Sequence, residues 1–159
     1  MAGVTVASHY DGAIKELIGA LKYQRAASAA GLAAELLAPL LASHAIDVVT
    51  CVATSPSRYR QRGYNQARLI AQPLARRLGL PYADLLVRTR DVRQVGTSRR
   101  QRLEQVQGIF EPRRARLIEG TSILLVDDVV TTGATMAECA RVLKEAGAKR
   151  VWGAAVAKH

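Results

Sequence analysis

The chain is poor in cysteine, histidine and aromatic residues. Its two cysteines, Cys51 and Cys139, are too far apart in the sequence to suggest a metal cluster by themselves. We expect both to be buried small side chains in a reducing compartment. The three histidines stand singly, and no catalytic role is assigned to them. With aromatic residues at 4%, the core must be built from Ala, Leu, Val and Ile, and the base-stacking surfaces of many single-strand binders are not evident.

Signals for membrane insertion and secretion are also missing. No segment approaches the roughly 18 consecutive apolar residues of a membrane span, and the first residues lack the basic start and apolar stretch of a signal peptide. We therefore expect a cytoplasmic protein without membrane insertion. An apolar fraction of 49% over 159 residues indicates a globular chain of one domain's length. Because no repeat or linker interrupts it, a single domain over residues 1–159 is expected.

Acidic residues are too few to balance the basic ones. The formal net charge is +10, and most of the arginines lie between Arg58 and Arg116. A positive field concentrated in this way favours polyanions such as pyrophosphate, nucleotides or nucleic acid. The alternative is a solvated, arginine-rich surface.

Apolar periodicity predicts helices that alternate with strands. After a short polar leader, helical patterns cover residues 10–23, 31–43, 65–78 and 136–146, and strand patterns cover residues 47–53, 83–88, 123–126 and 151–157. The first two helices are expected to pack on the sheet or to form a small hood. The alternation predicts an α/β fold with a doubly wound parallel sheet.

The central motif is an apolar strand from Ile123 to Val126, followed by Asp127, Asp128 and, after two valines, the turn Thr131-Thr132-Gly133-Ala134-Thr135. Ligands bind at the carboxyl ends of such strands. The glycine permits close backbone approach, and the threonine hydroxyls with free N–H groups of the loop and next helix would hold a dianionic phosphate. The two carboxylates would accept hydrogen bonds from a diol such as that of a ribose. The motif therefore predicts a ribose 5-phosphate site.

An ordinary strand followed by a capped helix would explain part of this motif. Thr132 or Thr135 would then be the cap, and the two acids would be solvated loop residues. A cap needs only one such residue, however, whereas this loop supplies five polar or glycine positions in order. The motif also lacks the Gly-Lys-Ser/Thr of a Walker A loop and the Gly-x-Gly-x-x-Gly of a dinucleotide fold.

The same stretch resembles the phosphoribosyl pyrophosphate (PRPP) signature of type I phosphoribosyltransferases. Further segments resemble the ComF family, also seen in GntX-type proteins, so that the similarity extends over nearly the whole chain. These segments are Leu21-Lys22-Tyr23, the stretch from Arg58 to Gln66, and Gln94 and Arg102 ahead of Phe110. Within them, Arg62-Gly63-Tyr64-Asn65-Gln66 differs from the family's Arg-Gly-Phe-Asn-Gln by one aromatic exchange.

The resemblance implies a Mg²⁺-dependent transfer of ribose 5-phosphate from PRPP to a nitrogen acceptor, with release of pyrophosphate. The catalytic residues would be Asp127 and Asp128, and the 5-phosphate would be bound by Val130, Thr131, Thr132, Gly133, Ala134 and Thr135. The forked donors of Arg58, Arg60 and Arg62 would bind pyrophosphate from the loop after the strand at residues 47–53. The long polar stretch at residues 89–107 predicts a flexible lid with Gln94, Arg99, Arg100 and Arg102. Mg²⁺ would be held mainly through PRPP and water, so no protein ligand is assigned to it.

Two other functions stay open. A ComF-like protein could bind PRPP, a nucleotide or single-stranded DNA without turnover and act in DNA uptake with an uptake ATPase. Alternatively, the fold could serve plain nucleic-acid binding.

Three departures from the family bear on these expectations. Family members generally carry an N-terminal cysteine-rich zinc segment, and this chain has no such cysteines. A naturally shortened member or a truncated chain would explain the difference. A structural zinc is therefore not expected. The chain has Cys51-Val52-Ala53 where the family tends to have Pro-x-Pro, and Gln105 where Asn is common. These changes leave the phosphate loop intact but bear on the geometry of the pyrophosphate loop.

Overall fold

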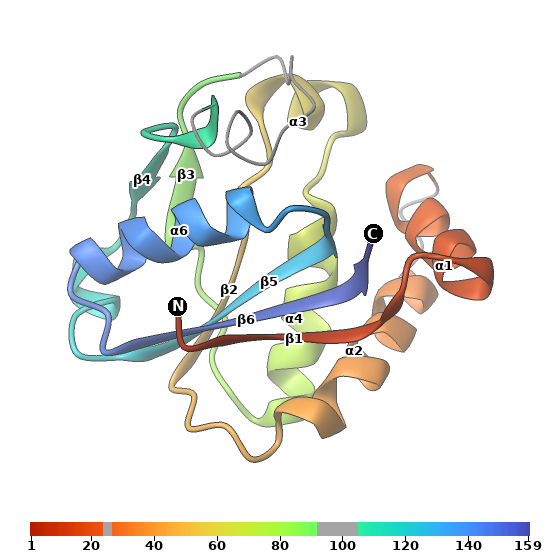
Figure 1. The fold of residues 1–159 in the computed structure, drawn as a ribbon, viewed down its shortest axis with the longest axis horizontal. Helices are drawn as coiled ribbons and strands as arrows, with labels where there is room; N and C mark the ends of the chain where they lie inside the picture. Colours follow the sequence, from red (N-terminus) through yellow and green to blue (C-terminus); the bar gives the residue numbers. More distant parts are fainter. Residues whose placement is uncertain (24–26, 92–104) are drawn as a thin grey trace.

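The computed structural model describes residues 1–23, 27–91 and 105–159, in which strands and helices alternate (Figure 1). The elements are β1 (Gly3–His9), α1 (Gly12–Tyr23), α2 (Ala27–Leu41), β2 (Val48–Cys51), α3 (Pro56–Arg62), α4 (Gln66–Leu78), β3 (Leu86–Arg88), β4 (Phe110–Pro112), the 3₁₀ turn η1 (Ala115–Leu117), β5 (Ser122–Val130), α6 (Ala134–Glu145) and β6 (Arg150–Lys158).

Four of the strands form one parallel sheet in the order β1-β6-β5-β2 (Figure 1). β5 is central, because it pairs with β6 along its whole length and with β2 from Val48↔Ile123 to Cys51↔Val126. β3 and β4 form a separate antiparallel ribbon. The prediction of an α/β fold with a parallel sheet is confirmed. Since β2 and β5 are parallel neighbours, the segments that follow them meet at one edge of the sheet.

The side chains of β5 alternate between two apolar layers. Leu124 and Val126 belong to the layer formed with α1, α2 and α4, whereas Ile123 and Leu125 belong to the layer formed with α6, β3 and β4. All four are fully buried. A strand covered on both faces is apolar at every position, which explains the continuous apolar run in the sequence.

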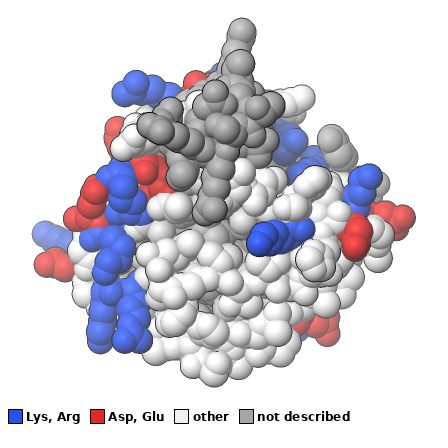
Figure 2. All heavy atoms as spheres, viewed as in Figure 1, with Lys and Arg blue, Asp and Glu red and all other residues white. Residues whose placement is uncertain are grey.

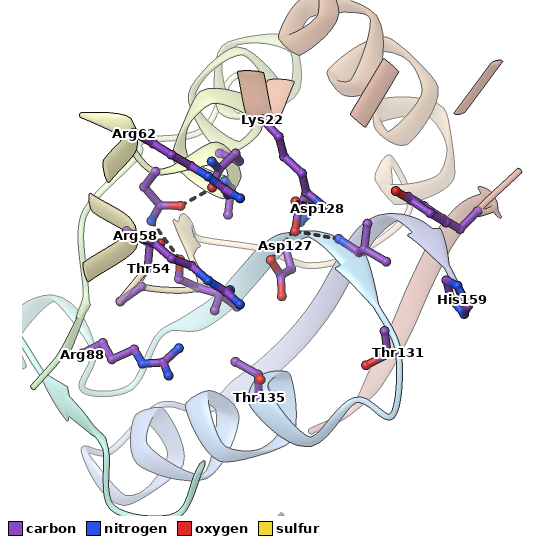
Figure 3. A pocket seen from close by; sticks show the side chains of 17 residues that line it. Lys22, Thr54, Arg58, Arg62, Arg88, Asp127, Asp128, Thr131, Thr135 and His159 are labelled. Atoms are coloured by element: carbon purple, nitrogen blue, oxygen red, sulfur yellow. Dashed lines mark hydrogen bonds and ion pairs between the residues drawn. The ribbon is translucent and has the colours of Figure 1, made fainter. Parts of the chain in front are cut away.

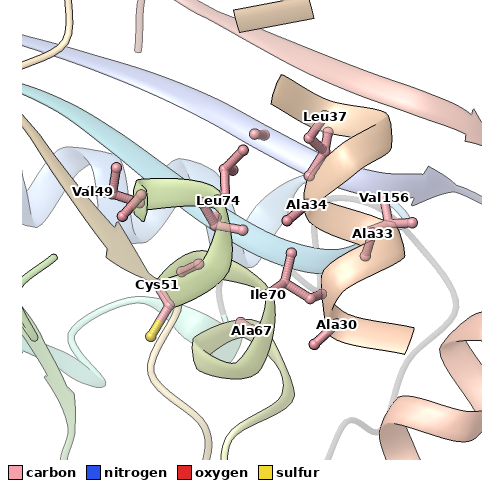
Figure 4. Close-up of a cluster of buried hydrophobic side chains, with 14 of the residues drawn as sticks. Ala30, Ala33, Ala34, Leu37, Val49, Cys51, Ala67, Ile70, Leu74 and Val156 are labelled. Carbon is pink, nitrogen blue, oxygen red and sulfur yellow. The ribbon is translucent and has the colours of Figure 1, made fainter. Parts of the chain in front are cut away.

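Small side chains allow α2 and α4 to pack closely on one face of the sheet (Figure 4). Ala30, Ala33 and Ala34 of α2 lie near Ala67 of α4, and larger aliphatic side chains such as Ile70 fill the remaining space. Apart from Cys51, the buried residues of this core are Ala, Leu, Val and Ile, as the scarcity of aromatic residues predicted.

The structure corrects the predicted bounds of the elements at two places. The first residues are not a polar leader but the edge strand β1, which pairs with β6 from Gly3↔Trp152 to His9↔Lys158. The Val4-Thr5-Val6 alternation was the available signal. β5 also continues past the two acids to Val130, because β6 pairs with it that far, and α6 begins at Ala134 rather than near Met136.

Candidate functional site

A cavity of about 360 Å³ opens at the carboxyl ends of β2 and β5 (Figure 3). This is the edge at which ligands bind in open α/β sheets. Segments from all parts of the chain line the cavity, so the fold brings together residues that are distant in the sequence. They are Tyr10, Lys22, Val52, Ala53, Thr54, Arg58, Arg62, Asn65, Gln66, Ala67, Arg88, Asp127, Asp128, Val129, Thr131, Thr135 and His159.

The predicted phosphate loop forms a tight turn between β5 and α6. Gly133 has φ 77°, a left-handed conformation that favours glycine, and the Thr132 hydroxyl oxygen accepts the Ala134 N–H at 3.4 Å. N–H groups in the first turn of α6 have no acceptor within the helix. A hollow of about 40 Å³ at this turn is lined by all six predicted residues, Val130, Thr131, Thr132, Gly133, Ala134 and Thr135. The turn therefore offers N–H and hydroxyl donors to one small anion.

The two acids lie beside this hollow. Asp127 lines both the hollow and the cavity, and Asp128 lines the cavity. The Asp128 N–H donates to Oδ1 of Asp127, and the Val129 N–H donates to Oδ1 of Asp128, both at 2.9 Å. Burial, and next the adjacent Asp128 carboxylate, raise the pKa of Asp127 well above its ordinary value. The pair therefore presents acceptor oxygens to the cavity in a setting that resists two full negative charges.

A lysine from the first helix compensates part of that charge. Nζ of Lys22 lies 3.7 Å from Oδ2 of Asp128 and 5.9 Å from the centre of the Tyr10 ring. The centre of the Tyr10 ring lies 5.5 Å from the centre of the His159 ring. The backbone N–H of His159 donates to the Val130 carbonyl oxygen at 3.0 Å. The end of α1 thus forms the predicted hood above the acids. Neither Lys22 nor His159 was assigned to the site from the sequence, although Lys22 lies in the Leu21-Lys22-Tyr23 motif.

The arginine-rich segment after β2 is the short helix α3, whereas the sequence analysis expected a loop. Ser55 caps the helix by accepting the Arg58 N–H at 3.3 Å, Pro56 occupies its first position, and Gly63 ends it with φ 76°. These residue types favour the start and the end of a helix, so the signal was present in the sequence.

The helix separates the three arginines predicted to bind pyrophosphate. Residues four apart lie on the same helix face, and Arg58 and Arg62 both line the cavity. Arg60, two positions from each, does not line the cavity; its Nη2 lies 3.8 Å from Oδ2 of Asp91 at the surface. Two of the three arginines are therefore placed to contact a ligand in the cavity, and Arg60 is not.

Arg88, at the carboxyl end of β3, is a further basic residue of the cavity. The strand predicted at residues 83–88 ends at Arg88, and no role in the site was assigned to this residue. Its place at the end of that strand was the only signal. Burial, and next the proximity of Arg58, lower the pKa of Arg88. Its guanidinium carbon lies 5.7 Å from the centre of the Phe110 ring. Two guanidinium groups that repel each other at one wall favour an anionic ligand between them.

Both cysteines are buried, as expected. Burial raises the pKa of Cys51 to about 12, and its Sγ lies 3.2 Å from the Tyr82 hydroxyl. This thiol therefore stays protonated and unreactive. The four predicted lid residues, Gln94, Arg99, Arg100 and Arg102, lie outside the described residues.

The cavity does not contain a metal cage built from protein side chains. Within residues 1–23, 27–91 and 105–159, no group of three or more His, Cys, Asp or Glu side chains is placed to hold a metal ion. The carboxylates of Asp127 and Asp128 are oxygen donors, which suit Mg²⁺ when phosphate oxygens and water complete its shell. No helix in the described part of the chain could span a membrane.

Sequence comparisons place this chain among named relatives. A family model described as phosphoribosyl transferase domain matches residues 64–159. DNA utilization protein YhgH of Escherichia coli K12 is 35% identical over 158 residues, which cover 93% of this chain and 68% of that protein. The same-named protein of Salmonella typhimurium is 33% identical, over 91% of this chain and 66% of its own. Competence protein ComFC of Streptococcus pneumoniae is 36% identical over 61% of this chain and 41% of its own. The chain thus spans about two thirds of the YhgH relatives' length.

Solved structures with similar folds are phosphoribosyltransferases and related enzymes. Adenine phosphoribosyltransferase from Thermoanaerobacter pseudethanolicus superposes with a TM-score of 0.56 at 16% identity, over 86% of this chain and 83% of that one. Glutamine PRPP amidotransferase from B. subtilis, complexed with ADP and GMP, gives a TM-score of 0.55 at 23% identity, over 86% of this chain and 30% of that one. These likenesses establish the fold of the type I phosphoribosyltransferases that the sequence predicted.

Proposed function

Since the chain belongs to the phosphoribosyl transferase domain family, in its ComF-type branch, we propose that it binds PRPP and acts as a phosphoribosyltransferase. The observation that carries this proposal is the arrangement of the cavity and the hollow beside it (Figure 3). Donors for a phosphate lie at the Thr131–Thr135 turn, two carboxylates lie at its centre, and arginines line the opposite wall. A PRPP molecule carries its 5-phosphate, its diol and its pyrophosphate in the same order.

The turn and the acids would fix the ribose phosphate before any bond changes. The 5-phosphate would occupy the hollow at Gly133, where N–H and hydroxyl donors hold it, and would contribute mainly position. Asp127 and Asp128 would accept hydrogen bonds from the ribose hydroxyls. The Lys22 ammonium lies 3.7 Å from Oδ2 of Asp128 and offsets part of the negative charge at this end of the cavity.

In the proposed transfer, the bond between ribose C1 and a pyrophosphate oxygen breaks, and its electron pair leaves with the pyrophosphate. The lone pair of an acceptor nitrogen forms the new bond to C1, and the proton of that nitrogen passes to water. Arg58, Arg62 and Arg88 would stabilise the negative charge on the leaving pyrophosphate. The carboxylates of Asp127 and Asp128 would stabilise the positive charge that develops on the ribose ring.

In this proposal, Mg²⁺ enters the site bound to PRPP. The donor set of the cavity contains two carboxylates, one of them paired with Lys22, and Mg²⁺ is commonly bound by one or two carboxylates together with substrate phosphates. Asp127 and Asp128 would be the protein side of its shell, directly or through water. When bound, the ion would neutralise pyrophosphate charge and make it a better leaving group.

Calorimetric titration tests the proposed function directly. PRPP with Mg²⁺ is expected to bind saturably and more tightly than ribose 5-phosphate, because only PRPP reaches both the phosphate turn and the arginines. Removal of Mg²⁺ with a chelator is expected to weaken PRPP binding, since more pyrophosphate charge then stays unneutralised. A chain with an intact thermal unfolding transition that gives no heat at millimolar PRPP would leave the proposal without support.

A second function for the same fold is suggested by the names of the relatives. DNA utilization and competence proteins match this chain, and its net charge of +10 favours binding to nucleic acid. In the face shown in Figure 2, Lys and Arg side chains gather along one side of the molecule, whereas the middle of the face carries little charge. In this second proposal, the protein binds single-stranded DNA or a nucleotide in the cytoplasm and acts with an ATPase in DNA uptake, without turnover.

Fluorescence anisotropy with a labelled single-stranded oligonucleotide checks this second candidate. Binding is expected at low salt. The logarithm of the association constant should fall linearly with the logarithm of the salt concentration, because the release of counterions from the DNA supplies the driving force. Excess PRPP should displace the oligonucleotide if the DNA enters the cavity. Absence of binding at low salt would contradict the second candidate and leave the first unaffected.

A further inference from the structure

The helix α1, which carries Lys22 in its last turn, is held to the rest of the molecule by little buried surface. Among its side chains that the structure describes, only Ile18 and Leu21 are buried. The carbonyl oxygens in the last turn of a helix have no partner within that helix. The position of Lys22 therefore depends on the contacts that hold this last turn from outside.

One such contact comes from Tyr64, which lies between α3 and α4. Its hydroxyl donates to the carbonyl oxygen of Leu21 at 2.9 Å. This carbonyl group belongs to the peptide unit that joins Leu21 to Lys22, and a peptide unit is planar from one Cα atom to the next. The hydrogen bond therefore restrains the backbone from which the Lys22 side chain extends.

The segment that carries Tyr64 is itself firmly held. Gly63 ends α3 with φ 76°, and Asn65 begins α4 by accepting the Ala67 N–H at 3.0 Å through its Oδ1. The Nδ2 group of Asn65 also donates to the Val52 carbonyl oxygen at 2.9 Å, which fastens this segment to the end of β2. The Tyr64 hydroxyl thus connects the loosely packed end of α1 to a fixed part of the cavity wall.

The side chain of Lys22 needs this support because no short hydrogen bond to the acids holds its ammonium. It extends from α1 toward Asp128, and Nζ lies 3.7 Å from Oδ2 of that residue (Figure 3). This distance is longer than a hydrogen bond. A lysine side chain also loses much rotamer freedom when its ammonium is kept in one place. A fixed backbone at Lys22 reduces that loss, because the side chain then starts from a single position.

We propose that Tyr64 is a positioning residue: its hydroxyl holds the last turn of α1 so that the Lys22 ammonium stays beside Asp128 and offsets negative charge when the polyanion PRPP enters the cavity. This inference rests on the proposed function. It assigns a role to the residue at which the Arg62–Gln66 segment differs from the ComF family, since the phenylalanine of that family has no hydroxyl to donate.

A double-mutant cycle tests whether Tyr64 acts through Lys22. Tyr64→Phe removes the hydroxyl but keeps the ring, and calorimetry with PRPP and Mg²⁺ is expected to show about fivefold weaker binding, the effect of one hydrogen bond. Lys22→Met removes the ammonium and should weaken PRPP binding about tenfold, since a charged group is lost. In the Lys22→Met background, Tyr64→Phe should cause no further loss, because the hydroxyl then has no ammonium to position.

Two controls separate this role from a general effect on the fold. Inorganic phosphate fits the hollow at the Gly133 turn, which Lys22 does not line, so its affinity should change by less than about twofold in all variants. Tyr59→Phe removes a hydroxyl from the neighbouring helix α3, but Tyr59 is 54% exposed and does not line the cavity. This variant should bind PRPP as the unmodified chain does.

The outcomes distinguish the inference from the function on which it rests. Unchanged PRPP affinity in Tyr64→Phe, or a loss that persists in full in the Lys22→Met background, would overturn the role of Tyr64 and leave the proposed function standing. An equal loss in Tyr59→Phe would overturn that role as well. An unmodified, folded chain that binds no PRPP would overturn the proposed function, and the inference with it.

Discussion

Replacing Arg58 and Arg88 together by alanine is expected to weaken PRPP binding by roughly a thousandfold. Hydrogen bonds to charged groups contribute about 1.5–3 kcal/mol each, and both guanidinium groups lie at the wall assigned to pyrophosphate. The free chain should become no less stable, because the double replacement removes two guanidinium groups whose charges repel each other and one of which is partly buried. Calorimetry with PRPP and Mg²⁺ measures the affinity, and thermal unfolding measures the stability.

Two comparisons make this result specific. Ribose 5-phosphate has no pyrophosphate, so its affinity for the double variant should change by less than about threefold, since only general attraction to a positive field is lost. Arg58→Ala alone and Arg60→Ala each remove one positive charge from the same helix. Because Arg60 does not line the cavity and is ion-paired with Asp91, its replacement should leave PRPP affinity nearly unchanged. Equal losses for Arg60→Ala and Arg58→Ala would mean that only net charge matters.

Replacing Asp127 by asparagine is expected to reduce turnover by about 10²–10³-fold, the size of effect seen when one preorganised electrostatic group is removed. The amide keeps the shape of the carboxyl group but cannot stabilise positive charge on the ribose ring. The measurement is the rate of pyrophosphate release from PRPP in the presence of a panel of nitrogen heterocycles as acceptors. Glu119→Gln supplies the control, because this exposed carboxylate precedes the opposite end of β5. Loss of turnover in that control would contradict a local role for Asp127.

The same variant should be more stable than the unmodified chain at neutral pH. Burial and the Asp128 carboxylate raise the pKa of Asp127 in the folded state, so the folded chain binds this proton more tightly than the unfolded chain does. Stability is then highest below the ordinary pKa and falls as pH rises toward the raised pKa. Asparagine does not titrate, so the free energy of unfolding of the variant should not show this decrease as the pH rises. Urea unfolding across a pH series checks it; an unchanged pH profile would mean that Asp127 is not strained by its surroundings.

The phosphate turn was predictable because all of its parts are neighbours in the chain. An apolar strand, a glycine that tolerates φ 77° and a helix start follow one another within residues 123–136, so local preferences decide their arrangement. The six predicted residues line one hollow as a result. The same local argument should also have identified α3, since Ser55, Pro56 and Gly63 carry ordinary helix-start and helix-end signals.

The rest of the cavity depended on contacts that no local pattern encodes. Arg88 reaches the cavity because the β3–β4 ribbon packs on the α6 face of the sheet, and Lys22 reaches it because the end of α1 overhangs β5. The burial of Gln66 in the cavity wall could not be foreseen, since it depends on which groups surround the side chain after folding. Arg60 was assigned to pyrophosphate because the whole segment was expected to be a loop facing it, whereas residues two apart in a helix lie on different faces.

The sequence by itself determined the glycine turn with its donors, the buried parallel strand before it and the surplus of arginines, because each depends on adjacent residues or on composition. Only the tertiary structure decided which arginines line the cavity and which cation lies beside the acids. The physical reason is that the order β6-β5-β2 and the packing of α1 are set by burial of apolar surface over the whole chain. The polar side chains around the cavity are placed by that packing and do not determine it.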